Sequence, residues 1–195
     1  MKSVIILCGG RSKRMGKDKG SMVLNGKPLI LHVLDIVKEV ADEIIIVLRD
    51  KNQFFEYSKI LGNVNDVSVV CDKLIDQGPL IGILTGLNSL KSDKALILPC
   101  DSPYITKNFI LNIFVIFESS NYDAVVPIWD NGHIEPLHSI YKKNILNSID
   151  NLVDNGKRDV SSLINSLNVN FVDVEDLDPT LFSFQNMNTI KDLNR

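Results

Sequence analysis

The amino-acid sequence predicts an α/β protein with a doubly wound, mostly parallel sheet and helices on both faces. Short apolar runs alternate with stretches in which apolar residues recur every three or four positions. The runs are almost continuously apolar, which is typical of parallel strands that are buried on both faces. Their alternation with helices predicts right-handed crossovers between parallel strands.

The strands are expected at Val4–Cys8, Ile44–Leu48, Val67–Cys71, Ala95–Leu98 and Ala124–Pro127. The helices between them are expected at Leu29–Val40, Asn52–Leu61, Leu80–Leu90 and Lys107–Phe117. In the first of these, Ile30, Val33, Leu34 and Val37 fall on one face, as in an amphipathic helix. Ligands of such sheets bind at the carboxyl ends of the strands.

After residue 128 the pattern changes. The turn signal Asp130-Asn131-Gly132 predicts a hairpin-like excursion into the loosely alternating segment His133–Tyr141. Further elements are expected as helices at Asn144–Asn155 and Asp159–Leu167, a strand at Val169–Val174 and a short last helix from Asn188. The 195 residues fit one domain, 1–195, and no repeat or linker divides them.

The charge of the chain is unevenly distributed. The formal net charge is −3, but residues 1–28 carry seven Lys or Arg and one Asp, which leaves −9 on the remainder. A mildly acidic protein with one basic segment is a poor general binder of nucleic acid, so no nucleic-acid partner is expected. The basic segment suits one small, highly charged anion.

The cysteines and the apolar runs indicate the cellular compartment of the protein. Cys8, Cys71 and Cys100 each end an apolar run and have no CxxC spacing, so we expect small buried residues at strand ends. Unpaired thiols suit a reducing cytosol, which predicts a cytoplasmic protein. No run approaches the roughly 18 apolar residues of a membrane span, and no cleavage site of a signal peptide follows the first run.

The segment after the first strand is a candidate phosphate site. Gly9 and Gly10 allow close approach of the backbone, whose N–H groups can cradle phosphate oxygens. Arg14 offers a fork of donors and Lys19 a point charge. The segment matches neither the Walker pattern nor the dinucleotide fingerprint.

Two carboxylates follow other strands. Asp101 comes after the strand Ala95–Leu98, and a carboxylate there is well placed to hold Mg²⁺ together with phosphate oxygens. Thr106 is the better cap for the next helix, so Asp101 is not needed for that role. Asp72 ends the strand Val67–Cys71, and Gly78-Pro79 follows as the start of a helix.

The glycines of that helix share one face. Gly82 and Gly86 are one turn apart, which indicates close approach of the helix either to a ligand or to the sheet. The helix by itself does not distinguish these two possibilities.

Taken together, these motifs resemble the MobA-type molybdenum cofactor guanylyltransferases of the nucleotidyltransferase superfamily. The matching patterns are LxGGxSxRMGxDK, D…GPLxGxxxGL and PCDxPY, with Lys27-Pro28-Leu29, Glu135-Pro136-Leu137 and the closing segment Phe184–Thr189. The resemblance implies a Rossmann-like nucleotidyltransferase fold. It divides the chain into a nucleotide-binding half, 1–105, and a pterin-substrate half, 106–195.

The resemblance also implies roles for single residues. Nucleotide contacts fall on Leu7, Cys8, Gly9, Gly10, Lys19, Asp72, Gly78 and Asp101. Pterin contacts fall on Asn186 and Asn188, and Mg²⁺ would bind Asp101. The implied catalytic residues are Arg14, Lys19 and Asp101, because phosphoryl-type transfer depends on positioning and charge stabilisation.

The implied reaction transfers GMP from GTP to the terminal phosphate of molybdopterin, which carries molybdenum or tungsten. It releases pyrophosphate and forms molybdopterin guanine dinucleotide. The implied partners are GTP, molybdopterin and an apo-molybdoenzyme or its chaperone. Lys157-Arg158 and His138 are further candidates for contact with the pterin side.

Alternatives remain open. The family often has Asn near the end of the second strand, where this chain has Val47-Leu48-Arg49, so a related enzyme that uses CTP or another phosphorylated cofactor precursor fits as well. A protein of a different class, a non-catalytic chaperone that carries molybdopterin, is the other alternative.

Overall fold

The computed structural model of the chain describes residues 1–8, 18–62, 66–72 and 78–187. Its strands are β1 (Ser3–Leu7), β2 (Val23–Leu24), β3 (Lys27–Pro28), β4 (Glu43–Leu48), β5 (Val67–Cys71), β6 (Lys94–Pro99), β7 (Ala124–Ile128), β8 (Ile140–Lys142) and β9 (Val169–Asp173). Its α-helices are α1 (Leu29–Lys38), α2 (Lys51–Leu61), α3 (Pro79–Ser89), α4 (Lys107–Glu118), α5 (Leu146–Asp154), α6 (Val160–Ile164) and α7 (Val174–Leu177). Short 3₁₀ turns form η1 (Lys143–Ile145) and η2 (Phe182–Phe184).

Within the described residues, the main sheet has seven strands in the order β5-β4-β1-β6-β8-β7-β9. Its strands pair in parallel, except that β8 runs antiparallel to both β6 and β7. The predicted doubly wound, mostly parallel sheet is therefore confirmed. The hairpin-like excursion is also present, but its strand β8 is shorter than the predicted segment, and only an isolated bridge joins Ile128 to Ile134.

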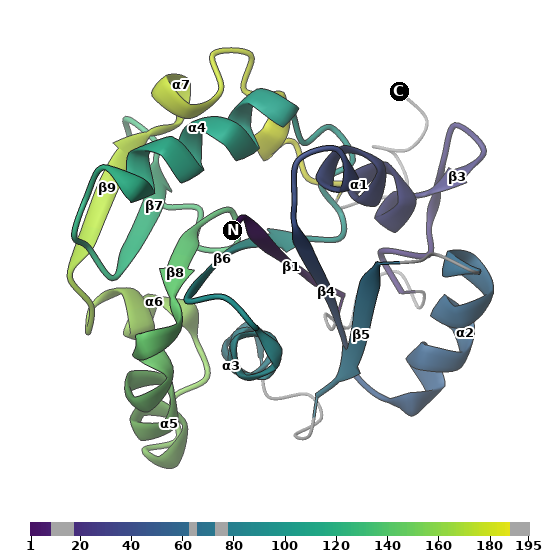
Figure 1. The fold of residues 1–195 in the computed structure, drawn as a ribbon, viewed down its shortest axis with the longest axis horizontal. Helices are drawn as coiled ribbons and strands as arrows, with labels where there is room; N and C mark the ends of the chain where they lie inside the picture. Colours follow the sequence, from purple (N-terminus) through teal and green to yellow (C-terminus); the bar gives the residue numbers. More distant parts are fainter. Residues whose placement is uncertain (9–17, 63–65, 73–77, 188–195) are drawn as a thin grey trace.

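Helices cover both faces of this sheet (Figure 1). Successive strand residues point to opposite faces, so Ile6 and Leu98 pack under α1, α2, α4 and α7, whereas Ile5 and Ile97 pack under α3, α5 and α6. This two-sided burial explains why the strands are apolar along their whole length. Among the described residues, no helix has the length and apolar character that a membrane crossing requires.

The helix starts follow the local chemistry of the sequence. The Thr106 hydroxyl caps α4 by accepting a hydrogen bond from the Phe109 N–H at 3.1 Å, which confirms that Asp101 does not have this role. Such a cap contributes about 1 kcal/mol. Pro79 occupies the first turn of α3, as its place after Gly78 predicts.

Several expectations need correction. The helix expected at Asp159–Leu167 is shorter, at Val160–Ile164, and the last strand ends at Asp173. Cys8 and Cys100 are buried as expected, but Cys71 is only half-buried because β5 is an edge strand.

The β2–β3 hairpin was not predicted, although its turn residues Asn25 and Gly26, with φ of 51° and 80°, are a strong hairpin signal. The helix expected from Asn188 lies outside the described residues.

Gly82 and Gly86 face the sheet, as one of the two possibilities left open by the sequence requires. A Cβ atom added to Gly86 would lie 2.6 Å from Ile5 Cγ2, and one added to Gly82 would lie 3.3 Å from Leu7 Cδ2. The small residues therefore let α3 pack closely on β1 and hold the carboxyl end of that strand.

We expect Gly86→Ala to lower the free energy of unfolding by about 1–3 kcal/mol, because the added methyl overpacks the interface with Ile5. Alanine is the better helix former, so an effect of propensity alone would have the opposite sign. Chemical denaturation measures the change. In a double-mutant cycle with Ile5→Ala, the combined cost should be smaller than the sum of the single costs, and additive costs would contradict the explanation.

Candidate active site

The carboxyl ends of β1 and β6 lie at a topological switch point. From β1 the chain continues to β4 and β5 on one side, and it then returns to β6 on the other side of β1. Loops that leave neighbouring strands in opposite directions open a crevice, which is the usual ligand site of such sheets. Here the two strands lead into Cys8 and into Cys100-Asp101.

Lys19 and Asp101 meet at this point. Lys19 Nζ lies 2.6 Å from Asp101 Oδ2, and the two side chains are 26% and 11% exposed. Both residues were predicted as site residues, and the structure brings them together although they are far apart in the sequence. Because the pair is mostly buried, solvent screens its charges less than those of a surface ion pair.

Hydrogen bonds from side chains of α2 hold Asp18, the residue before Lys19. The Asp18 carboxylate accepts hydrogen bonds from the Tyr57 hydroxyl and from Gln53 Nε2, the latter at 2.7 Å. Gln53 Nε2 also donates to the Cys8 carbonyl at 2.7 Å, so one buried side chain links the end of β1 to Asp18. The pKa of Asp18 is raised above its ordinary value, because burial outweighs the hydrogen bonds from Tyr57, Ser21 and Gln53, which lower the pKa.

Sequence reasoning missed the residues of this network. Gln53, Tyr57 and Leu61 are four positions apart and form the buried face of α2. A glutamine in an otherwise apolar stripe was the signal that could have identified Gln53 as a structural polar residue.

Asp72 has an unsatisfied oxygen. Its Oδ1 is buried and has no hydrogen-bond partner among the described residues. The pKa of Asp72 is raised above its ordinary value, because burial outweighs the hydrogen bond with the Thr85 side chain, which lowers the pKa. Buried polar atoms are nearly always paired, so an orphaned acceptor at the ligand-binding end of the sheet fits a place that a ligand completes. Strands β4 and β1 separate Asp72 from Asp101.

Gly78 lies at the start of α3 with φ of +83°. A Cβ atom there would lie 2.8 Å from the Arg158 carbonyl oxygen, so the segment between α5 and α6 packs against the start of α3. Arg158 Nη1 donates to the carbonyls of Val153 and Lys157, each at 2.7 Å. The structure thus places a residue from the second half of the chain beside a predicted nucleotide residue of the first half.

The remaining predicted nucleotide residues differ in accessibility. Leu7 is half-buried at the end of β1, whereas the Cys8 side chain is buried in the core. Its backbone is also paired, because the Cys8 N–H donates to the Val47 carbonyl at 2.9 Å and the Cys8 carbonyl accepts from Gln53. Gly9, Gly10, Arg14 and Asn188 lie outside the described residues.

The C-terminal segment returns to the end of β6. The Met187 N–H donates to the Asp101 carbonyl at 2.8 Å, and the Ser102 hydroxyl donates to Asn186 Oδ1. Asn186, one of the two predicted pterin residues, therefore lies next to the predicted magnesium residue. Ser102 is a further residue of this region that sequence reasoning did not identify.

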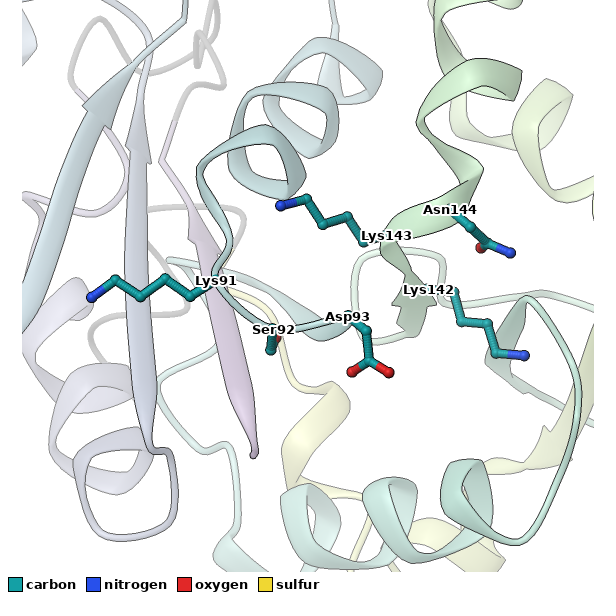
Figure 2. Close-up of a pocket in the computed structure, with 6 residues that line it drawn as sticks. All are labelled: Lys91, Ser92, Asp93, Lys142, Lys143 and Asn144. Atoms are coloured by element: carbon teal, nitrogen blue, oxygen red, sulfur yellow. The ribbon is translucent and has the colours of Figure 1, made fainter.

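A surface cavity of about 440 Å³ lies at the other end of β6 (Figure 2). It is lined by Lys91, Ser92, Asp93, Lys142, Lys143 and Asn144. Figure 2 shows that Lys142 points away from Lys91 and Lys143, and Lys143 Nζ donates to the Leu90 carbonyl. These ammonium groups do not converge on one anion, so the candidate site remains the strand ends at Asp101.

The residues at Asp101 fit a magnesium ion that shares its coordination with substrate. Among the residues that the structure describes, no three His, Cys, Asp or Glu side chains gather into a complete metal site. Mg²⁺ in phosphate-transfer sites instead uses one or two carboxylates and takes its other ligands from phosphates and water. The Asp101 carboxylate, whose side chain is 11% exposed, would supply one such ligand.

The chain is similar to known proteins over most of its length. The family model described as a MobA-like NTP transferase domain matches residues 4–170. The chain is 39% identical over 193 residues to a probable molybdenum cofactor guanylyltransferase of Methanothermobacter thermautotrophicus, covering 98% of this chain and 96% of that protein. It is 33% identical over 193 residues to a protein of Methanocaldococcus jannaschii with the same name, covering 97% and 95%.

A solved structure has the same fold. It is the molybdopterin-guanine dinucleotide biosynthesis protein A from Archaeoglobus fulgidus, which superposes with a TM-score of 0.84 at 27% identity and covers 99% of this chain and 95% of that one. The family match spans β1 through the start of β9 and includes the Lys19–Asp101 pair. The chain therefore belongs to the nucleotidyltransferases of the MobA-like NTP transferase family.

Proposed function

We propose that this protein transfers GMP from GTP to the terminal phosphate of molybdopterin, releasing pyrophosphate and forming molybdopterin guanine dinucleotide in a Mg²⁺-dependent reaction. The observation that carries the proposal is the close pairing of Lys19 with Asp101 at the switch point of a MobA-like domain. The names of the relatives from both methanogens support the same substrates.

The proposed roles follow from the charges of the residues. Lys19, with Arg14, would stabilise the negative charge that develops on the leaving pyrophosphate. Asp101 would hold Mg²⁺, which when bound neutralises phosphate charge and makes the α-phosphorus more electrophilic. Positioned charges of this kind account for most catalysis of phosphoryl-type transfer, and no covalent enzyme nucleophile is required.

The proposed substrate contacts divide the chain into its two halves. Leu7, Cys8, Gly9, Gly10, Asp72 and Gly78 would contact the nucleotide from residues 1–105. Asn186 and Asn188 would contact the pterin from residues 106–195. The orphaned Oδ1 of Asp72 supports a ligand contact there, because a donor on the nucleotide would satisfy it.

The acceptor needs little activation. The terminal phosphate of molybdopterin is a monoester with a second pKa of about 6, so it is already ionised near neutral pH. A general base is therefore not assigned. We place the reaction in the cytoplasm, where the free thiols of Cys8, Cys71 and Cys100 stay reduced, and propose that the product passes to an apo-molybdoenzyme or its chaperone.

A second candidate is the corresponding transfer from CTP. It is favoured by the end of β4, where the family often has Asn and this chain has Val47-Leu48-Arg49. Arg49 Nε donates to Asp50 at 2.7 Å. None of these three side chains carries the amide group of the family's usual asparagine.

The deciding experiment offers purified protein molybdopterin and Mg²⁺ with α-labelled GTP or CTP. We expect label to enter a dinucleotide product from GTP, with equimolar pyrophosphate. Preferential incorporation from CTP would replace the guanylyl assignment with the second candidate. Tight binding of molybdopterin without pyrophosphate release from either nucleotide would instead indicate a carrier.

A further inference from the structure

A buried chain of polar side chains lies beside Asp101. Ser102 directly follows Asp101, and its hydroxyl donates to Asn186 Oδ1. The ring nitrogen Nε2 of His138 lies 3.0 Å from the same hydroxyl oxygen. A serine hydroxyl has a single proton, which here is directed to Asn186, so the contact with His138 requires a proton on Nε2 that is donated to Ser102. The chain thus runs from His138 through Ser102 to Asn186.

The His138 ring is held firmly in place. It is 1% exposed and makes edge contacts with Phe109 of α4 and Phe184 of η2, at ring-centroid distances of 6.2 Å and 5.5 Å. On its other side, Nδ1 lies 3.6 Å from Glu135 Oε2 and has no hydrogen-bond partner among the described residues. Packing from three different segments therefore directs Nε2 at Ser102.

The segment that ends the chain of contacts is partly open to solvent. Asn186 is half-buried, whereas Ser102 and His138 are buried. Because Asn186 Oδ1 is taken by Ser102, the amide group that remains available is the NH₂ donor, and within the described part of the chain no partner of that donor is found. The Met187 N–H anchors the same segment to the Asp101 carbonyl.

We infer that His138 is a positioning residue for the phosphorylated pterin substrate, acting through Ser102 to orient Asn186. The inference rests on the proposed function, which places Asn186 on the pterin side of the site. The arrangement fixes the Asn186 amide and leaves its NH₂ as the group available to a ligand, and such a donor suits a substrate rich in acceptors, such as a phosphate or a pterin carbonyl. His138 itself does not touch the substrate.

The test compares two substitutions at His138. His138→Leu keeps most of the buried volume but removes the donor, so we expect the KM for molybdopterin to rise about tenfold, as for the loss of one ordering hydrogen bond, while the KM for GTP changes less than about twofold. His138→Gln places an amide NH₂ near Ser102 and should restore the molybdopterin KM to within about threefold of wild type. Equilibrium binding of GTP should be the same for all three proteins.

Two further variants distinguish positioning from simple packing. Ser102→Ala interrupts the chain without changing His138 and should raise the molybdopterin KM to a similar extent, which also serves as the test if His138→Leu does not fold. Adding His138→Leu to Asn186→Ala should cause no further rise beyond that of Asn186→Ala alone.

The outcomes separate this inference from the proposed function. Wild-type protein that makes no guanylyl product from molybdopterin would overturn both. An active wild type whose His138→Leu variant has an unchanged molybdopterin KM, or equal changes in both KM values, would overturn only the positioning role. Failure of His138→Gln to rescue would do the same, because it would indicate a requirement for the ring shape rather than for the donor.

Discussion

Replacing Asp101 by asparagine is expected to slow GMP transfer by about 10²–10³-fold while the protein remains folded. Asparagine keeps the shape of the side chain but removes the charge that faces Lys19 at 2.6 Å and that would hold Mg²⁺. The loss should appear in kcat more than in the KM for GTP, because charge stabilisation matters most as the α-phosphorus reacts. Pyrophosphate release under single-turnover conditions measures it.

The same strand provides a matched control. Asp93 lies directly before β6, whereas Asp101 lies just after the other end of that strand. The Asp93 side chain is exposed. Asp93→Asn makes the same chemical change and should leave the rate within about twofold, since exposed ion pairs contribute little. If Asp101→Asn kept more than a third of the wild-type rate, the role proposed for this carboxylate would be wrong.

The Asp178→Ala variant is expected to lose about 3 kcal/mol or more of unfolding free energy, since several donors would lose their charged acceptor. Asp178 Oδ2 accepts from the N–H and hydroxyl of Ser183 at 3.0 and 2.6 Å, and Oδ1 accepts from the N–H and hydroxyl of Thr180 at 3.1 and 2.6 Å. Oδ2 also meets the Thr106 hydroxyl at 3.3 Å. One buried carboxylate thus organises the turn that leads to Asn186.

The stabilisation by Asp178 should depend on pH. Burial raises the pKa of this carboxyl, but the hydrogen bonds from Ser183 and Thr180 outweigh burial and lower the pKa below the ordinary value of 3.8. A group whose pKa is lowered on folding contributes fully above its unfolded pKa, and it loses that contribution as the pH falls through the folded pKa. The stability difference between wild type and Asp178→Asn should therefore be largest near neutral pH and shrink below about pH 4.

The neighbouring residue Asp176 serves as the control for both measurements. It lies exposed on α7, so Asp176→Ala should change the unfolding free energy by no more than about 0.5 kcal/mol. Chemical denaturation at several pH values compares the variants. A cost for Asp178→Ala as small as that for Asp176→Ala would show that the network around Asp178 does not stabilise the fold.

The central sheet could be predicted because its signals are local. A strand buried on both faces must be apolar at successive positions, and β1, β4, β5, β6 and β7 each lie within about a residue of the expected runs. β8 was less visible because only Ile140–Lys142 pairs, and the short elements α7 and η2 contain too few residues to show a period.

In the candidate site, sequence patterns identified the residues that lie in loops directly after predicted strands. Lys19 and Asp101 were expected near the phosphates because each follows a buried strand, and their 2.6 Å contact agrees with that expectation. Gln53 and Ser102 were not assigned to the site because their partners are 35 or more residues away, and His138 was expected on the pterin side without its partner Ser102. The group to which such a side chain hydrogen-bonds can be identified only when the positions of both residues in the fold are known.

The amino-acid order alone determined the class of fold, and it predicted the end of the sheet at which a ligand would bind and the residues Lys19 and Asp101 there, because these depend on periodicity and on the residues that follow each strand. The three-dimensional packing showed that Gly82 and Gly86 face strand β1, that Cys71 is half-buried, and that His138 reaches Asn186 through Ser102. These features arise where distant segments come within a few ångströms, and steric fit and hydrogen-bond direction act only at that range.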